Sequence, residues 1–458
     1  MKLAVLSILI FWMTWSSAQD VRLLSWPGRD YYDPEILPSK DAMVWMDERR
    51  VLWYAELDSL TGAFREGDGR QILVDTSGSL LQSWNAGEFL EDAQGWQIIY
   101  TRPDHNDLPQ LHAAKLTDHA FEVRQLTTGS RPNAGAIVSR NPAYSSGKLL
   151  YFHGPIQQDA DMVWADVDTP NQRNRIGVFA RGFSHGDFFP GPSFGLVYVD
   201  LDTTGYYQMY TLTEGKPPEA ITRSPFHKQN PMAVQAPEYH HTLVLACIQE
   251  TAMGDSLLFF HQEAGEWTLV SRIGVPTGSD YHRFSSSEMF VFQGHTWVSV
   301  QIEDPIGGGV QPAEIWILRM DGQQAIRMDE QQGVQRRTDP EHYVTEDRLH
   351  IYYNLRRNNT WELWVSTLKA EQVTSARSVP TSPPVWIAPN PVGEDYIWVE
   401  AVDDYQTYQL VDLQGRVMLT GRMKRERTPI YLGQVPAGMY WLLLRGPMVR
   451  EFLSVVRQ

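Results

Sequence analysis

The chain has 458 residues, 42% of them hydrophobic, and a formal net charge of −16 at pH 7. This acidic balance argues against a nucleic-acid-binding protein, because phosphate backbones are bound by clustered lysine and arginine. The only cysteine, Cys247, excludes an internal disulfide, so packing alone must stabilise the fold. Cys247 lies in an apolar run and is expected to be a buried small hydrophobic residue.

Residues 1–18 have the layout of a secretory signal peptide. Lys2 gives a short positive region, Leu3 to Trp15 form an apolar core, and Ser16-Ser17-Ala18 is a small-residue cleavage site. This apolar run is too short to span a bilayer, and no later segment reaches about 18 consecutive apolar residues. We therefore expect cleavage after Ala18 and an exported protein without a transmembrane helix.

Residues 19–374 form a series of short strands separated by turns, and no convincing amphipathic helix is found between residues 21 and 374. Openings that mostly contain proline, each followed by apolar and aromatic strands, recur at intervals of roughly 40 to 57 residues, the period of propeller blades. The seven openings are Asp33-Pro34, the region of Asn85, Asn141-Pro142, Phe189-Pro190, Asn230-Pro231, the region of Arg283, and Asp339-Pro340. They predict an all-β propeller of seven four-stranded blades, with six or eight blades, or two β-sandwich domains, as alternatives. Residues 21–25 are expected to complete the last blade.

Two segments of the fourth repeat resemble the repeats of TolB-like and WD40-like propellers. They are Gly205-Tyr206-Tyr207-Gln208-Met209-Tyr210 and Glu219-Ala220-Ile221-Thr222. The resemblance implies a propeller fold. The Ser-Pro-Asp-Gly hairpin common in that group is missing from this chain.

Three aspartates are the candidate catalytic residues: Asp33, Asp187 and Asp339. Propeller glycosidases place carboxylates on inner strands around a central channel, one as general acid and one as base or nucleophile. The competing interpretation is structural, because Asp or Asn before proline initiates turns by bonding nearby backbone amides. Asn141 and Asn230 at corresponding places favour this structural interpretation, since an amide cannot transfer protons.

Other motifs are better explained as structural. Gly191-Pro192-Ser193-Phe194-Gly195 matches the nucleophile elbow of serine hydrolases, but a strand rather than a helix is expected to follow it. His240 and His241 are adjacent, so on a strand they would face opposite ways and could not share a metal ion. The acidic loops at Asp166 to Asn174 and Asp200 to Gly205 lack the glycine and terminal glutamate of an EF-hand. No metal or cofactor site is predicted, and Gly307-Gly308-Gly309 lacks the partners of a phosphate loop.

A linker rich in proline, serine and threonine is expected at residues 375–386, and a second domain at 387–458. Apolar strands are expected at 396–399, 408–411 and 440–444, with two shorter ones at 430–432 and 452–456. Gly415 occupies a tight hairpin that needs positive φ, and Pro436 and Gly438 form a second reversal. The pattern predicts a small Ig-like antiparallel β-sandwich.

Four motifs of this tail occur in a characteristic order: Pro389-Asn390-Pro391, Tyr408 to Gly415, Ile430-Tyr431-Leu432 and Pro436 to Tyr440. They resemble the C-terminal sorting domain, or Por secretion tail, of type IX secretion cargo of Bacteroidetes. The resemblance covers roughly the last 70 residues. It implies export through the periplasm and across the outer membrane, to the cell surface or the extracellular space, with the secretion machinery as partner. The residues that carry the sorting motif would be Pro389, Asn390, Pro391, Asp412, Gly415, Gly438 and Tyr440. An accessory β-sandwich without a sorting role is the alternative.

The leading functional hypothesis is a secreted or cell-surface propeller that binds a protein or a glycan without catalysing a reaction. One alternative is a glycan-active hydrolase that uses the inner-strand carboxylates. The other alternative is a structural subunit of a surface assembly.

Overall fold

A computed structural model of the chain gives the architecture. It describes residues 19–24, 29–65, 71–76, 87–117, 120–155, 160–178, 186–251, 254–276, 278–304, 312–328, 335–357, 359–375, 386–388, 395–400, 406–424, 428–445 and 450–457. The predicted signal peptide, most of the predicted linker, Gly307 to Gly309 and the motif Pro389-Asn390-Pro391 lie outside these residues. Within them, no helix is long and apolar enough to cross a membrane.

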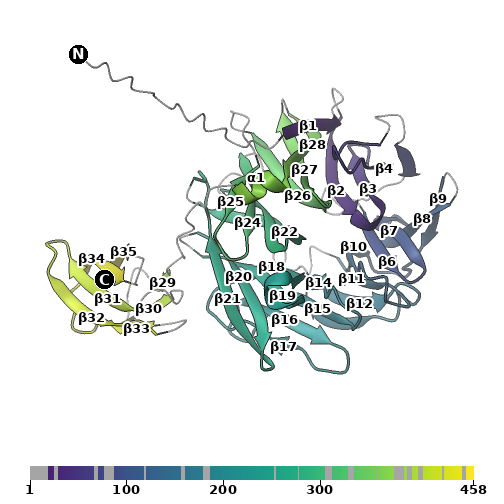
Figure 1. Cartoon of the computed structure of the whole chain (residues 1–458). Coiled ribbons are helices and arrows are strands. Elements are labelled where there is room, and N and C mark those ends of the chain that lie inside the picture. Colours follow the sequence, from purple (N-terminus) through teal and green to yellow (C-terminus); the bar gives the residue numbers. More distant parts are fainter. Residues whose placement is uncertain are drawn as a thin grey trace, which may run out of the picture.

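Seven four-stranded antiparallel blades are arranged in a ring around a central axis (Figure 1), and one parallel residue pair, Ala313 with Arg336, joins the last two blades into an eight-stranded sheet. The inner strands, which contact one another around this axis, are β2 (Tyr31–Leu37), β6 (Glu88–Asp92), β10 (Asn133–Val138), β14 (Gly186–Phe188), β18 (Lys228–Ala236), β22 (Arg283–Phe292) and β26 (Arg336–Val344). The second strands are β3 (Ala42–Asp47), β7 (Gly95–Pro103), β11 (Lys148–His153), β15 (Gly195–Leu201), β19 (Thr242–Gln249), β23 (His295–Glu303) and β27 (Arg348–Arg357). The prediction of an all-β, seven-bladed propeller is confirmed.

The third strands of the blades are largely buried, and the outermost strands are more exposed. The third strands are β4 (Leu52–Glu56), β8 (Pro109–Thr117), β12 (Asp161–Asp166), β16 (Tyr207–Thr213), β20 (Ser256–Glu263), β24 (Ala313–Arg319) and β28 (Thr360–Lys369). The outermost strands are β5 (Ile72–Asp75), β9 (Ala120–Gln125), β13 (Asn174–Val178), β17 (Glu219–Ala220), β21 (Glu266–Gly274), β25 (Ala325–Arg327) and β1 (Gln19–Leu24). Apolar side chains of neighbouring blades interlock, which gives a stacked core that no single blade can form.

The ring closes because its last blade combines both ends of the propeller sequence. Strand β1 pairs antiparallel with β28, and Val21 lies opposite Val365. Leu24 is 2% exposed and packs with residues of the first and last blades. The N-terminal strand therefore joins the last blade to the rest of the ring, as the sequence predicts.

A β-bulge recurs at one position of the inner strands. Within the described residues, the strand register shifts there in β2, β10, β18, β22 and β26. One residue of each bulge has a left-handed backbone, namely Asp33 (φ 54°), Gly135 (φ 62°), Asn230 (φ 49°), Ser286 (φ 35°) and Asp339 (φ 62°). Glycine adopts this conformation without strain, and asparagine and aspartate tolerate it best among the other residues.

The bulges correct one part of the predicted repeat. Asn141-Pro142 and Phe189-Pro190 do not correspond to Asp33-Pro34, since they lie between the first and second strands of their blades. The residue of the third blade that corresponds to Asp33 is Gly135. Asn141 does form a turn, where its Oδ1 accepts a hydrogen bond from the Ala143 N–H at 3.0 Å. Asp33, Asn230 and Asp339 form bulges instead of turns.

A buried Gln–Thr pair links the third strand of a blade to the segment after its outermost strand. In the fourth blade, Thr222 Oγ1 donates to Gln208 Oε1 at 2.8 Å and accepts from the Met209 N–H at 3.0 Å. Thr127 makes the same two bonds, to Gln110 Oε1 at 2.8 Å and from the Leu111 N–H at 2.9 Å. The Ile221-Thr222 segment thus has a definite structural role.

Replacing Thr222 with valine should destabilise the propeller. Valine has nearly the same shape but leaves the Met209 N–H and Gln208 without their buried partner, so we expect a loss of about 1–3 kcal/mol in the free energy of unfolding. Urea denaturation measures this loss. Thr268→Val, on the exposed surface of β21, is the matched control. Equal effects of the two changes would contradict the assigned role of the Gln–Thr pair.

Helical structure is sparse among the described residues. A single helical turn follows each of two inner strands, η1 (Pro38–Lys40) and η3 (Pro237–Tyr239). One short α-helix, α1 (Ala370–Ser375), follows β28 and buries Val373. This helix was not expected from the sequence, because six residues are too few to establish a helical period.

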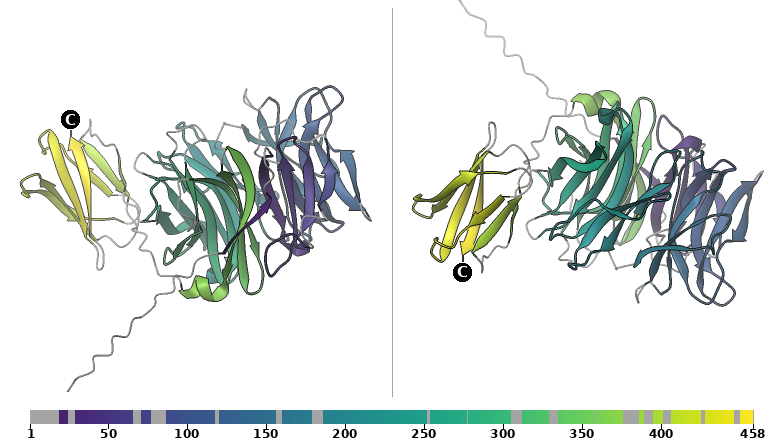
Figure 2. Two further views of the ribbon diagram at one scale, coloured as in Figure 1. Left: turned by 90° about the horizontal axis from the view of Figure 1, so that it is seen from above. Right: turned by 90° about the horizontal axis from the view of Figure 1, so that it is seen from below.

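The tail forms a small β-sandwich, as predicted. One sheet contains β29 (Trp386–Ala388), β30 (Tyr396–Glu400) and β33 (Thr428–Tyr431). The other contains β32 (Val417–Arg422), β31 (Thr407–Asp412), β34 (Gly438–Arg445) and β35 (Arg450–Arg457). Figure 2 shows the two sheets packed face to face, and their inner side chains form a core of their own.

Candidate functional site

Acidic side chains gather on the inner strands around a single arginine. This group, called the axial cluster below, consists of Asp33, Glu35, Glu88, Arg140, Asp187, Glu288, Asp339 and Glu341. Its carboxyl groups come from β2, β6, β14, β22 and β26, and Arg140 follows β10. Charges of one member alter the pKa of others throughout the cluster, which shows that the ring brings the side chains together. The three predicted candidates Asp33, Asp187 and Asp339 are all among them.

Arg140 connects two neighbouring blades. One of its guanidinium nitrogens, Nη2, lies 2.7 Å from Glu35 Oε2 and 3.3 Å from Glu88 Oε2. Burial alone would lower the pKa of Arg140, but the carboxylates of Glu35 and Glu88 raise it, so the guanidinium stays charged. The Arg140 side chain is 34% exposed, against 12% for Glu35. Water therefore reaches the axial cluster at Arg140.

Asp33 and Asp339 form a carboxyl pair at the bulges of the first and last blades. The Asp33 side chain interacts with the Asp339 carboxyl group and lowers its pKa. Ser286 Oγ donates to Asp339 Oδ1 at 3.2 Å. The backbone N–H groups of Asp33 and Asp339 are satisfied by Asn354 Oδ1 at 3.0 Å and Gln301 Oε1 at 3.2 Å, respectively. Burial raises the pKa of Asp339, and the interactions of its side chain with Asp33 and Ser286 only partly oppose this effect.

Asp187 and Glu288 are two further carboxyl groups of the axial cluster, and their proton affinities differ. Burial raises the pKa of Asp187 to about 6, although the Ala233 N–H donates to its Oδ2 at 2.8 Å. Burial and the negative charge of Asp187 raise the pKa of Glu288 to about 8. Near neutral pH, Glu288 is thus protonated while Asp187 is mostly ionised. Acid–base catalysis by two carboxyl groups requires one protonated and one ionised group.

Burial also raises the pKa values of the remaining glutamates, while the charge of Arg140 lowers those of Glu35 and Glu88. Burial, together with the charge of Glu88, raises the pKa of Glu35 well above its ordinary range. The pKa of Glu341 is raised in the same way by burial and by the charge of Glu35. Protonated and ionised carboxyl groups therefore coexist in the axial cluster, so it offers both hydrogen-bond donors and acceptors.

The fold does not require carboxyl groups at these positions. The bulge residue is aspartate in β2 and β26, but Gly135, Asn230 and Ser286 form the same bulge in other blades. Two residues after the bulge residue, three blades have a glutamate: Glu35, Glu288 and Glu341. In two other blades the same position holds Ile137 or Met232, which pack among apolar neighbours. A buried carboxyl costs free energy that an apolar residue at the same position does not. Titratable groups retained at such a cost indicate a functional site.

The stability of the protein should fall as pH rises from about 5 to about 8 through the contributions of Asp187 and Glu288. Both have raised pKa values in the folded state, so their contribution is fully present below the ordinary pKa values of 3.8 and 4.5 and is lost as pH rises through about 6 and about 8. Urea denaturation at several pH values measures the slope. The double variant Asp187→Asn, Glu288→Gln should have a flatter profile, and identical slopes would contradict the assignment.

The other sequence candidates lie elsewhere. Ser193 is exposed in the connection between β14 and β15, and a strand follows it as expected. His240 and His241 lie in the turn after η3, both with left-handed backbones, so the assumption that they occupy a strand was wrong. Cys247 is fully buried, and burial raises its pKa to about 12. Among the described residues, no group of three His, Cys, Asp or Glu side chains has the geometry of a metal site.

Several cluster members were not identified as candidates from the sequence. Glu35 and Glu341 follow Asp33-Pro34 and Asp339-Pro340 directly, so the repeated Asp-Pro-Glu triplet was a usable signal. Glu88, Arg140 and Glu288 have no such signature. Arg140 in particular precedes Asn141-Pro142, which obscured its position at the end of an inner strand.

The described sorting-motif residues have structural roles in the tail. Gly415 has φ 79° in the hairpin between β31 and β32, as predicted. Asp412 Oδ1 accepts from the Gln414 N–H at 3.0 Å and the Arg416 N–H at 2.8 Å in this hairpin. Gly438 opens β34, where Tyr440 Oη donates to the Pro436 carbonyl at 2.7 Å. These contacts explain the turns of the sandwich.

No protein-family model and no curated protein matches the chain. Among solved structures, an oligogalacturonate lyase in complex with manganese is similar over 78% of this chain and 94% of its own, with a TM-score of 0.51 at 10% identity. A Trypanosoma rangeli sialidase matches over 92% and 89%, with a TM-score of 0.41 at 10% identity. A prolyl endopeptidase matches over 82% and 54%, with a TM-score of 0.48 at 12% identity. At this identity, the likeness to the lyase shows the propeller fold and nothing further.

Proposed function

We propose that this protein is an exported β-propeller that binds a glycan at its axial cluster. The observation that carries the proposal is that Glu35, Glu288 and Glu341 occupy a position that holds the apolar residues Ile137 and Met232 in other blades. It supports a role for the carboxyl groups beyond the fold. Sugar hydroxyl groups both donate and accept hydrogen bonds, so a mixture of protonated and ionised carboxyl groups suits them.

Binding of the mature protein to an array of surface polysaccharides tests this function. Glu341→Gln should weaken the binding strongly, since the amide nitrogen only donates and replaces a carboxyl oxygen that can accept hydrogen bonds from sugar hydroxyl groups. Glu219→Gln, on the exposed outer strand β17, is the matched control and should bind normally. Binding that is equal in both variants, or absent from the unmodified protein, would count against the proposal.

Hydrolysis of the glycan is the second candidate function, and the Asp187–Glu288 pair favours it. In this reaction Glu288 would protonate the leaving-group oxygen, and Asp187 would act as base or nucleophile. Release of new reducing ends, with a bell-shaped dependence on pH, is the expected result. The changes Asp187→Asn and Glu288→Gln should each abolish the release. If a glycan binds but no reducing ends appear, the protein is a binding module.

We also propose that residues 1–18 and the tail direct the protein to the cell surface or the extracellular space. The expected cleavage site after Ala18 directly precedes β1, so cleavage would leave the closing strand complete. The tail has its own sheets and core, which suits a separable transport signal. Deleting residues 387–458 should leave a folded propeller trapped in the periplasm. Unchanged surface delivery of this variant would contradict the sorting role.

A further inference from the structure

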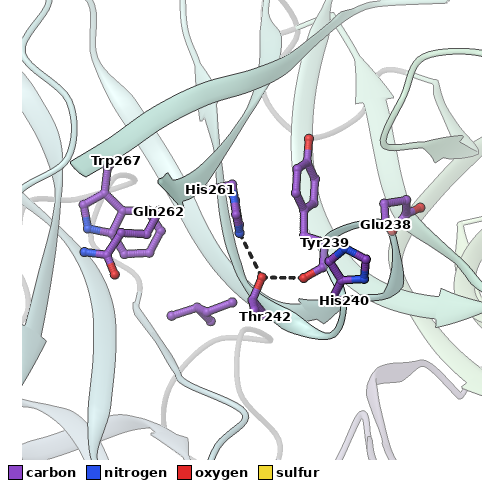
Figure 3. Close-up of a pocket in the computed structure, with 8 residues that line it drawn as sticks. Glu238, Tyr239, His240, Thr242, His261, Gln262 and Trp267 are labelled. Carbon is purple, nitrogen blue, oxygen red and sulfur yellow. Dashed lines mark hydrogen bonds between the residues drawn. The ribbon is translucent and has the colours of Figure 1, made fainter. Parts of the chain in front are cut away.

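A pocket of about 390 Å³ lies on the fifth blade, away from the inner-strand residues of the axial cluster. It is formed by the turn η3 that follows β18, the start of β19 and the hairpin of β20 and β21. The residues that line the pocket include Glu238, Tyr239, Thr242, His261, Gln262 and Trp267. Figure 3 shows Trp267 and Gln262 on one side, and Tyr239 and Glu238 on the other.

His261 and Tyr239 form an oriented aromatic wall. Their rings stack with centroids 4.3 Å apart and an angle of 23° between planes. Thr242 Oγ1 donates its proton to the Tyr239 carbonyl at 2.6 Å, so it must accept from His261 Nε2 at 2.8 Å (Figure 3). The neutral ring therefore carries its proton on Nε2, and Nδ1 is an acceptor. Nδ1 is buried and has no hydrogen-bond partner among the described residues, although the Glu263 carboxylate approaches it with Oε1 at 4.0 Å.

Trp267 and Gln262 face each other across the β20–β21 ladder. The indole Nε1–H of Trp267 is buried and, within the described part of the chain, has no hydrogen-bond acceptor. Gln262 Nε2 donates to the Gly265 carbonyl at 3.0 Å, which fixes the amide with its oxygen available to accept. Buried polar atoms normally have partners, so an unpaired donor and an unpaired acceptor in one pocket call for an explanation.

The pocket is held in shape by the sixth blade. Glu238 Oε1 accepts from the Thr296 N–H at 2.7 Å, and its Oε2 accepts from Thr296 Oγ1 at 2.7 Å. These bonds fix η3 and also occupy the carboxylate of Glu238. The pocket therefore presents aromatic faces and neutral polar atoms, with this carboxylate already engaged.

We propose that this pocket binds a neutral pyranose ring, independently of the axial cluster. The C–H face of a sugar stacks on the aromatic rings, while its hydroxyl groups pair with the indole N–H of Trp267 and with Nδ1 of His261. The volume lies within the range of small-molecule sites, which are mostly apolar with a few placed polar groups. The site provides a sugar contact on the blade surface.

Saturation-transfer NMR of the full mature chain with methyl β-D-glucopyranoside, methyl β-D-galactopyranoside and methyl α-D-mannopyranoside tests the proposal. At least one glycoside should receive saturation, and Trp267→Ala should weaken its binding about tenfold or more. Trp267→Phe, which keeps an aromatic face but loses the N–H, should give an intermediate loss. It also provides the test if Trp267→Ala does not fold.

Two control variants separate this site from other surfaces. Trp441→Ala removes an exposed tryptophan of the tail, so it should leave the glycoside signal unchanged, whereas Glu288→Gln changes the axial cluster and should leave the part of the signal that Trp267→Ala removes. A signal that is lost in Glu288→Gln but kept in Trp267→Ala would place sugar binding at the axial cluster alone and overturn the proposal. Absence of saturation transfer to all three glycosides would overturn it as well.

Discussion

Deletion of Gln19–Leu24 is expected to prevent the propeller from forming a stable closed ring. The deletion removes the outermost strand of the last blade and the ladder that β1 makes with β28. It also uncovers the apolar residues of β28 that Leu24 and its neighbours cover. Burial of Leu24 contributes about 1.5–3 kcal/mol, and the partly buried Val21 and Leu23 and the lost ladder add to this. The sum is comparable to the whole stability of an ordinary domain, roughly 5–15 kcal/mol.

Thermal unfolding followed by circular dichroism, together with size-exclusion chromatography, measures the effect of this deletion. The expected result is loss of the cooperative transition or aggregation through the exposed edge of β28. A chain that begins at Gln19 is the matched control and should unfold cooperatively. A truncated chain that melts like this control would contradict ring closure by β1.

Replacement of Arg140 with glutamine is expected to destabilise the propeller by roughly 2 kcal/mol near pH 7. The change leaves Glu35 and Glu88 without the guanidinium that compensates their charge. Breaking a fully buried ion pair costs about 3–5 kcal/mol, and the partial exposure of Arg140 lowers this figure. Near pH 5 the loss should be smaller, because the raised pKa values of Glu35 and Glu88 allow both groups to take up protons.

Urea denaturation at the two pH values measures the effect of Arg140→Gln. The control is Arg124→Gln on the exposed outer strand β9, where the same chemical change should cost little at either pH. An Arg140→Gln loss that does not depend on pH would indicate a packing role for the side chain instead of charge compensation.

The propeller could be predicted because blade strands leave a strong local pattern. Runs such as Leu149-Leu150-Tyr151-Phe152 and Leu196-Val197-Tyr198-Val199 are apolar throughout, as strands buried between neighbouring blades must be. The small tail sandwich left a similar signal, since Gly415 and Gly438 mark its reversals. The repeat interval then gave the number of blades without any knowledge of contacts.

The axial cluster was harder to predict because the ring assembles it from distant residues. Asp33 and Asp339 interact although most of the propeller sequence separates them. The sequence drew attention to the prolines after these aspartates, and the expected turns proved to be bulges. Arg140 could not be assigned, because β10, the strand that it follows, has glycine where the four other bulged inner strands have Asp, Asn or Ser.

One experiment tests most directly whether the axial carboxyl groups bind a ligand. It measures the melting temperature of Glu288→Gln at about pH 8 together with the glycan binding of this variant. Since burial disfavours the ionised form of Glu288, the uncharged amide should raise the melting temperature while glycan binding is lost. A lower melting temperature with unchanged glycan binding would show that the carboxyl group maintains the fold, and would contradict the proposed role.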